Sequence, residues 1–472
     1  MRQSWTLVTG ARSTATMDDI LFWAAILGLA WAPFWFGSNR EIAWFINAAY
    51  FGGLTLLFQA SRWAAKRPHP VSLKRVAFPA LGFTIVCVWI LVQASTLTPT
   101  LLHHPFWQWV GQGLEIDVPG SITLNRTETY IALLRLLTAG CAFWLFLQLG
   151  RSPQRAHWTV QAVATIGIIY AVYGLVAFFV FPRTLLWFPK EFYLESVTST
   201  FINRNSYATY AGIGLVCALG AALGHYVRHG TRAGQSVARR AASFLAATAG
   251  PSGAWLAAAF ILGMALVLTG SRGGIVASIA GVIAFVVLML MRGRNAVAGL
   301  GVFLALLTVG IAIFAFGDLL AARLLALGFD SADRLAVYRL TILSIFDAPW
   351  TGFGYGTFQN VFPMYRDNSV PLLGVWDKAH NTYLEIFQGL GIPFAVLFLC
   401  VLSVLAARSA YAALSRQSAA TVPLVAASAT VIVTLHSFVD FSMQIQAVAL
   451  TWTALLGAGV AQSWSGRIST AA

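Results

Sequence analysis

The sequence predicts an all-α polytopic membrane protein with about twelve transmembrane helices in a single domain, residues 1–472. Two observations support this fold class. Hydrophobic residues make up 58% of the chain and charged residues only 10%, whereas about a quarter of the residues of a soluble protein are charged. Apolar stretches of about 18 or more residues also recur along the whole chain, and each could cross the hydrocarbon layer as a helix.

The expected spans follow these apolar stretches in order. The first ends in WAPFWFG, whose aromatic residues suit a membrane interface, so we expect no cleaved signal peptide. We predict spans at 20–36, 41–61, 76–94, 129–149, 157–181, 206–226, 253–270, 273–291, 296–316, 382–405, 421–440 and 445–463.

Basic residues gather in alternate loops, which accounts for the net charge of +14 without a nucleic-acid partner. By the positive-inside rule these loops and both termini are cytoplasmic. The opposite face then receives the loops at 95–128, 182–205 and 317–381. The last of these, between spans nine and ten, is too long for a simple connection. Its segments DLLAARLLAL and DRLAVYRLTILSIF have helical spacing, so we expect a large, partly helical loop.

The sequence indicates neither a cofactor nor a metal site. The four cysteines, Cys87, Cys141, Cys217 and Cys400, lie inside apolar stretches at wide spacings, which is typical of small buried side chains. No HExxH motif or paired aspartates occur in the loops of the non-cytoplasmic face. We therefore expect any phosphate chemistry to use arginine, whose planar fork suits phosphate.

Three basic side chains stand at junctions between loop and span on the non-cytoplasmic face: Arg204, Arg272 and His380. Arg272 lies in SRGG, where glycines allow close backbone approach and the helix start favours an anion. Histidine titrates near neutrality and can act as a general base. The alternatives are arginines that reach lipid headgroups, a plain helical hairpin at SRGG, and a histidine that only begins a helix.

Other polar residues have expected supporting roles. Asn203, Asn205 and Asn381 can cap the helices beside these basic residues. His436 and Asp440 are four residues apart, so we expect them to share one helix face and to satisfy each other. The ionisable residues Arg135 and Glu385 also fall at membrane depth, with partners that the sequence does not identify.

Five segments in order, NRNSYATY, TGSRGGIVAS, GFGYGTFQNVFPMYR, KAHNTYLEIFQGLGI and HSFVDFSMQIQ, resemble the bacterial O-antigen ligase and polymerase superfamily, over about residues 183–464. Ten residues separate His380 from Gly391, as in the family's ligases. The family's arginine precedes a leucine by four positions. Arg272 has Val276 there, whereas Arg339 and Leu343 fit the pattern but lie in the loop.

The resemblance implies a metal-independent, inverting glycosyltransferase of the bacterial inner membrane with a periplasmic active site. Its donor would be a glycan on undecaprenyl pyrophosphate. Arg204 and Arg272 would bind the pyrophosphate, and His380 would deprotonate or orient the acceptor hydroxyl.

Two reactions remain open within this family. A polymerase extends lipid-linked repeat units and must hold two pyrophosphates, whereas a ligase transfers the finished chain onto lipid A-core. Additional basic residues on the non-cytoplasmic face, which would suit a second anionic or acceptor site, favour polymerisation. They are Arg334, Arg339, Arg366 and Lys378, with Arg323 beside them. A transporter is the alternative from another class, although its halves should then be related and its polar residues should lie near mid-membrane.

Overall fold

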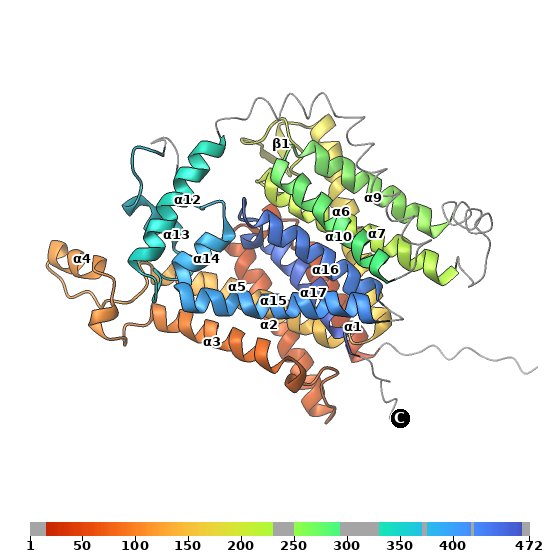
Figure 1. The fold of residues 1–472 in the computed structure, drawn as a ribbon, viewed down its shortest axis with the longest axis horizontal. Coiled ribbons are helices and arrows are strands. Elements are labelled where there is room, and N and C mark those ends of the chain that lie inside the picture. The colour runs from red at the N-terminus through yellow and green to blue at the C-terminus, as the bar shows by residue number, and fades with distance from the viewer. Residues whose placement is uncertain (1–15, 230–249, 293–329, 371–374, 417–419, 465–472) are drawn as a thin grey trace, which may run out of the picture.

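The computed structural model describes residues 16–229, 250–292, 330–370, 375–416 and 420–464. Within these ranges the chain is almost entirely helical (Figure 1). A hairpin of two short antiparallel strands, with Thr184 opposite Pro189, lies in the connection between two long helices.

The α-helices and strands are α1 (Met17–Trp31), α2 (Glu41–Ala64), α3 (Ala77–Ala94), α4 (Phe106–Leu114), α5 (Arg126–Leu149), α6 (Pro153–Val180), β1 (Thr184–Leu185), β2 (Phe188–Pro189), α7 (Arg204–His229), α9 (Pro251–Leu268), α10 (Arg272–Met291), α12 (Asp330–Asp347), α13 (Phe358–Val361), α14 (Thr382–Leu390), α15 (Ile392–Ser415), α16 (Thr421–His436) and α17 (Gln446–Ala461). Short 3-10 helices are η1 (Phe36–Ser38), η2 (Leu73–Val76), η3 (Thr100–Leu102), η4 (Phe362–Met364) and η5 (Ser442–Gln444).

The chain is a multi-pass membrane protein. Among the described residues, 8 helices are long and apolar enough to cross a membrane, and the apolar helices α16 and α17 are shorter. These helices fall on the predicted spans. The first expected span is shorter than predicted, because α1 ends at Trp31 just before Pro33. The expected span at 296–316 lies outside the described residues, so the count of twelve stays a prediction.

The most buried helices are α7, α16 and α17, and α16 and α17 lie at the centre of the bundle (Figure 1). Their inner positions are largely alanine, glycine, serine and threonine, and nearly every residue of α17 is buried. Small side chains let helices approach closely where lipid offers no hydrophobic driving force. The outer helices instead expose large apolar side chains, such as Leu56 in α2 and Leu81 in α3, as a lipid-facing surface requires.

One end of the bundle collects the basic residues of the alternate loops. Arg62 forms an ion pair of 2.5 Å with Asp18, and Arg155 one of 3.0 Å with Asp19. Arg292 Nη1 donates to the Ala413 carbonyl at 2.8 Å. The two ion pairs join the start of α1 to the end of α2 and to the start of α6, and the hydrogen bond joins the ends of α10 and α15.

The opposite end carries α4, α12, α13 and α14, and we call it the α12 end (Figure 1). The segment DRLAVYRLTILSIF is helical as predicted and forms most of α12, whereas DLLAARLLAL, with Arg323, lies outside the described residues. Helix α12 packs on a small core that includes Val337, Phe358, Phe362 and Ala379. Since Ala379 directly precedes His380, this core supports the chain at the predicted catalytic residue.

The prediction of one continuous helix over 382–405 is wrong. Gly391, with φ +78°, separates the short helix α14 from α15. A Cβ at this position would lie 2.6 Å from the Trp350 carbonyl oxygen, so the break needs both the backbone freedom and the small size of glycine. The ten residues between His380 and Gly391 therefore delimit a separate helix.

Candidate functional site

Helix α14 is attached to the connection between α16 and α17, residues 437–445. The Asn381 side chain caps α14 by accepting from Tyr383 and Leu384 N–H groups, both at 3.1 Å, and donates to the Phe438 carbonyl at 2.9 Å. Thr382 N–H donates to the Ser437 carbonyl at 2.9 Å. The predicted cap at Asn381 is thus confirmed, and it also fixes α14 in space.

His380 occupies a backbone conformation that side-chain-bearing residues seldom adopt, with φ +54°. Its carbonyl accepts a hydrogen bond of 2.8 Å from the Tyr338 hydroxyl of α12. The imidazole contacts the rings of Trp376 and Phe441 edge-on. Its Nδ1 lies 4.0 Å from Asp440 Oδ1, and its side chain is 19% exposed. Asp440 can therefore stabilise positive charge on an imidazole that stays accessible.

Asp440 is fully buried, and it does not share a helix with His436. Helix α16 ends at His436, so Asp440 lies in the following turn, and the prediction of a common helix face is wrong. The two residues take different partners. Asp440 accepts a hydrogen bond of 3.1 Å from Asn205 Nδ2, and His436 Nδ1 lies 2.6 Å from the Thr209 hydroxyl. Both side chains consequently bind the first turns of α7.

The SRGG segment packs against this same region. Ser271 caps α10 by accepting from the Gly274 N–H at 3.2 Å. A Cβ on Gly273 would lie 3.1 Å from the His436 ring, and one on Gly274 would lie 2.5 Å from the Ala208 Cβ. The predicted close backbone approach is therefore toward α16 and α7. The exposed Arg272 directly precedes the two glycines that make these contacts.

Arg204 begins α7, beside the loop that contains β1 and β2. Asn203 caps the helix by accepting from the Asn205 N–H at 2.7 Å. The Arg204 guanidinium lies over the Tyr193 ring at 5.2 Å and reaches Ser196 Oγ at 3.5 Å. Lys190 Nζ donates to the Ser196 carbonyl at 2.7 Å, and burial lowers the pKa of Lys190 to about 8. A second cation therefore adjoins Arg204.

The residues predicted for a second anionic site differ in their charge partners and in whether they line the cavity. Arg339 forms an exposed ion pair of 2.8 Å with Asp367, which compensates its charge. Arg334 Nη1 lies 3.4 Å from the carbonyl oxygen of Val439, next to Asp440. Lys378 lines the cavity described below, whereas Arg366 follows η4 and does not line it.

A cavity of about 1310 Å³ opens beside His380 and continues between the membrane helices. Its apolar part lies between α3, α5, α15 and α17, and its polar part is at the α12 end. The cavity wall includes Asn203 and Tyr193 but neither Arg204 nor Arg272. Apolar lining residues include Phe83, Leu136, Phe143, Phe398, Leu402 and Leu456, and polar ones include Tyr355, Lys378, His380, Glu385 and Gln444.

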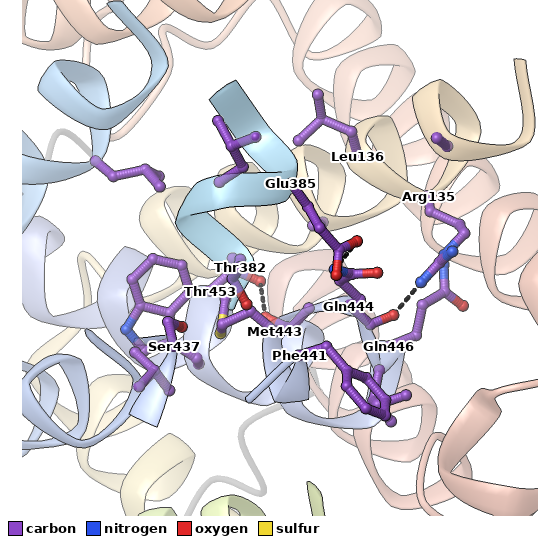
Figure 2. A pocket seen from close by; sticks show the side chains of 18 of the residues that line it. Arg135, Leu136, Thr382, Glu385, Ser437, Phe441, Met443, Gln444, Gln446 and Thr453 are labelled. Carbon is purple, nitrogen blue, oxygen red and sulfur yellow. Dashed lines mark hydrogen bonds between the residues drawn. The ribbon is translucent and has the colours of Figure 1, made fainter. Parts of the chain in front are cut away.

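Arg135 and Glu385, whose partners the sequence could not identify, meet at Gln444 in this cavity. Figure 2 shows both side chains reaching Gln444, one from α5 and the other from α14. Arg135 Nη2 donates to the Gln444 carbonyl, and the Gln444 amide donates to Glu385 Oε2 at 2.7 Å. Sequence reasoning missed Gln444. The sequence did indicate that a polar partner was needed, because Arg135 and Glu385 are two ionisable residues at membrane depth.

The glycine-rich segment GFGYGTF, at 352–358, forms hydrogen bonds with the C-terminal end of α14. The N–H groups of Phe353 and Gly354 donate to the carbonyls of Gln388 and Gly389, at 2.9 and 3.1 Å. The side chain of Gln93 donates to the Gly389 carbonyl at 2.7 Å. This glycine-rich segment therefore has a structural role beside the site.

The connection at 437–445 carries the buried carboxylate of Asp440 and lies beside the accessible imidazole of His380. The helix starts that bear Arg204 and Arg272, those of α7 and α10, pack against the same connection. Such groups can orient or deprotonate a hydroxyl and neutralise a leaving phosphate. Among the residues that the structure describes, no group of three histidine, cysteine, aspartate or glutamate side chains is placed to hold a metal ion.

Residues 257–399 match a family model described as O-antigen ligase. The match runs from α9 into α15 and includes Arg272 and His380, so the predicted superfamily resemblance is confirmed over this segment. No curated protein matches the chain.

Proposed function

We propose that this membrane protein, which carries an O-antigen ligase family domain at residues 257–399, is an inverting glycosyltransferase of the bacterial inner membrane. Its donor is a glycan on undecaprenyl pyrophosphate, its acceptor is a sugar hydroxyl, and its α12 end faces the periplasm. The observation that carries the proposal is the position of His380. Its imidazole lines the large cavity and lies 4.0 Å from the buried carboxylate of Asp440.

In the proposed reaction, the acceptor hydroxyl attacks the anomeric carbon from the face opposite the pyrophosphate. His380 accepts the hydroxyl proton or orients the hydroxyl, and Asp440 stabilises the resulting imidazolium. The bond from the anomeric carbon to the pyrophosphate oxygen breaks. Arg204 and Arg272 offset the charge on the departing lipid pyrophosphate, a role that needs no metal ion.

The cavity supports a lipid-linked substrate. Its apolar part runs along α3, α5, α15 and α17, so an isoprenoid chain can lie between these helices while its head group stays at the polar end. A carrier binds its solute near the middle of the membrane, whereas the pair of His380 and Asp440 lies at one end of the cavity. We therefore favour transfer chemistry over transport.

For the reaction itself we propose polymerisation of lipid-linked repeat units, with ligation onto lipid A-core as the alternative. Arg334, beside Asp440, and Lys378, in the cavity wall, support a second anionic site. Arg339 contributes less, because Asp367 already pairs with it.

Purified protein with lipid-linked donor tests these proposals. His380→Ala should lower single-turnover transfer by about 10²–10⁴-fold and leave donor affinity unchanged, whereas His69→Ala, at the other end of the bundle, should have no effect. Arg272→Lys should weaken donor affinity, since it keeps the charge but loses the planar fork. Parental transfer by His380→Ala would limit the histidine to starting a helix.

Products distinguish the reactions. Lipid-linked repeat units alone should give longer chains if the protein is a polymerase, whereas a ligase should need added lipid A-core. Transfer should survive excess chelator. Loss of transfer in chelator, followed by its recovery when magnesium or manganese is added, would contradict a metal-free mechanism. Movement of the lipid-linked glycan across proteoliposome membranes without any covalent product would instead support a transporter.

A further inference from the structure

We propose that Glu385 is a positioning residue for His380. It holds the backbone that presents the imidazole, and it ties that backbone to the cavity wall. This inference rests on the proposed function, because it assigns Glu385 a task in the same transfer reaction.

Both carboxylate oxygens of Glu385 are engaged. Oε1 accepts a hydrogen bond of 2.8 Å from the Ala379 N–H, and Oε2 accepts one of 2.7 Å from the Gln444 amide. Hydrogen bonds to a carboxylate are shorter and stronger than bonds between neutral groups. One side chain in the first turn of α14 therefore reaches back to the residue before His380 and across to η5.

His380 needs such support because of its backbone. A φ of +54° costs a residue with a side chain free energy and persists only where neighbouring contacts determine it. The Glu385 bond fixes the Lys378–Ala379 peptide, the Tyr338 hydroxyl fixes the His380 carbonyl, and the Asn381 cap fixes the peptides that follow. Without the first contact, the chain between the buried Ala379 and α14 can relax.

Contacts with two membrane helices hold the far end of this support. The backbone carbonyl of Gln444, the residue that binds Glu385, accepts a hydrogen bond from the Arg135 guanidinium. That guanidinium also lies over the Trp44 ring, 4.4 Å from its centroid. Side chains from α2 and α5 thereby help to set the position of Gln444. Gln444 in turn holds Glu385, which holds the N–H of Ala379, the residue before His380. Displacing a reacting group by about 1 Å can reduce a rate about 10²-fold.

A direct acid–base role for Glu385 is the competing explanation, since the side chain also lines the cavity. Three substitutions separate the two roles. Glu385→Ala removes both acceptors. Glu385→Gln cannot carry the proton but keeps an oxygen at the right reach for the Ala379 N–H. Its NH2 group can donate to Gln444 Oε1 once the Gln444 amide turns over. Glu385→Asp keeps the charge but is one methylene shorter.

The experiment measures donor affinity and single-turnover transfer between about pH 5.5 and 8.5 on full-length variants that are monodisperse in detergent. We expect Glu385→Ala and Glu385→Asp to transfer about 10- to 100-fold more slowly with donor affinity within about twofold of the parent. Glu385→Gln should stay within about threefold of the parent and keep the parental pH profile. Glu115→Gln, at an exposed carboxylate just after α4 that does not line the cavity, is the control and should behave as the parent.

A double variant gives the second readout. If Glu385 acts through His380, then adding Glu385→Ala to His380→Ala should reduce transfer no further than His380→Ala alone. Multiplicative losses, or an inactive Glu385→Gln beside an active Glu385→Asp, would overturn the positioning role. Parental transfer by Glu385→Ala would do the same. Failure of the proposed function looks different, since then the parent makes no product or His380→Ala is fully active.

Discussion

Asn205 Nδ2 donates a hydrogen bond of 3.1 Å to Asp440 Oδ1, which joins residues 235 positions apart in the chain. Asn205 lies in the first turn of α7, next to Arg204, and Asp440 lies 4.0 Å from the His380 imidazole. The bond therefore connects the predicted pyrophosphate side of the site to the predicted base. It also supplies a donor to a carboxylate that water cannot reach.

Removing this donor should destabilise the protein. We expect Asn205→Ala to lower the free energy of unfolding by about 1–3 kcal/mol, because a buried carboxylate loses a hydrogen bond. Asn205→Asp should cost more, since it places two carboxylates in contact. Thermal unfolding in detergent measures both. The control is Asn360→Ala, whose side chain makes only a 3.5 Å contact with Asn125 at the surface. Equal melting temperatures for Asn205→Ala and the parent would contradict the assigned bond.

The contact of α10 with α7 predicts an effect of adding one methyl group. Gly274→Ala should destabilise the protein by about 1–3 kcal/mol, because the new Cβ would lie 2.5 Å from the Ala208 Cβ. It should also lower donor affinity by moving Arg272. Gly53→Ala in α2 is the control. A Cβ there meets nothing within 4 Å, so stability should be unchanged or raised by up to about 1 kcal/mol.

Lys190 predicts a pH dependence of stability. Its pKa is about 8 in the folded protein and about 10.4 in an unfolded chain, so between these values the unfolded chain binds more protons. The stability contribution of Lys190 should therefore rise with pH across this window. The melting temperature of the parent should rise relative to that of Lys190→Met as the pH is raised from about 7 to about 10. A difference that does not vary with pH would contradict the lowered pKa of the half-buried Lys190.

The orientation of the α12 end can be tested with single cysteines in a variant whose four natural cysteines are replaced by alanine. Ser369→Cys lies at the α12 end and Ala65→Cys at the basic end, and both positions are exposed. A membrane-impermeant thiol reagent on intact spheroplasts should label the first, and should label the second only after permeabilisation. The reverse result would place His380 in the cytoplasm and remove the periplasmic donor from the mechanism.

Much of the fold could be predicted from local sequence. Long apolar stretches need helices in a membrane, because every backbone N–H and carbonyl must be paired there. The spans around α2, α3, α5, α6 and α7 follow from this alone. The caps at Asn203 and Asn381 are equally local, since each side chain accepts from an N–H two residues later.

The contacts that assemble the site were decided by tertiary structure. Hydropathy indicates that a stretch is buried or faces lipid. It does not determine how far one helix is shifted along its neighbour. The partners of Asp440 and Glu385 depend on that shift, as the distance of 59 positions between Glu385 and Gln444 illustrates. The break at Gly391 was hidden for the same reason. An apolar stretch reads as one span, and only the packing of the Trp350 carbonyl against Gly391 divides it into two helices.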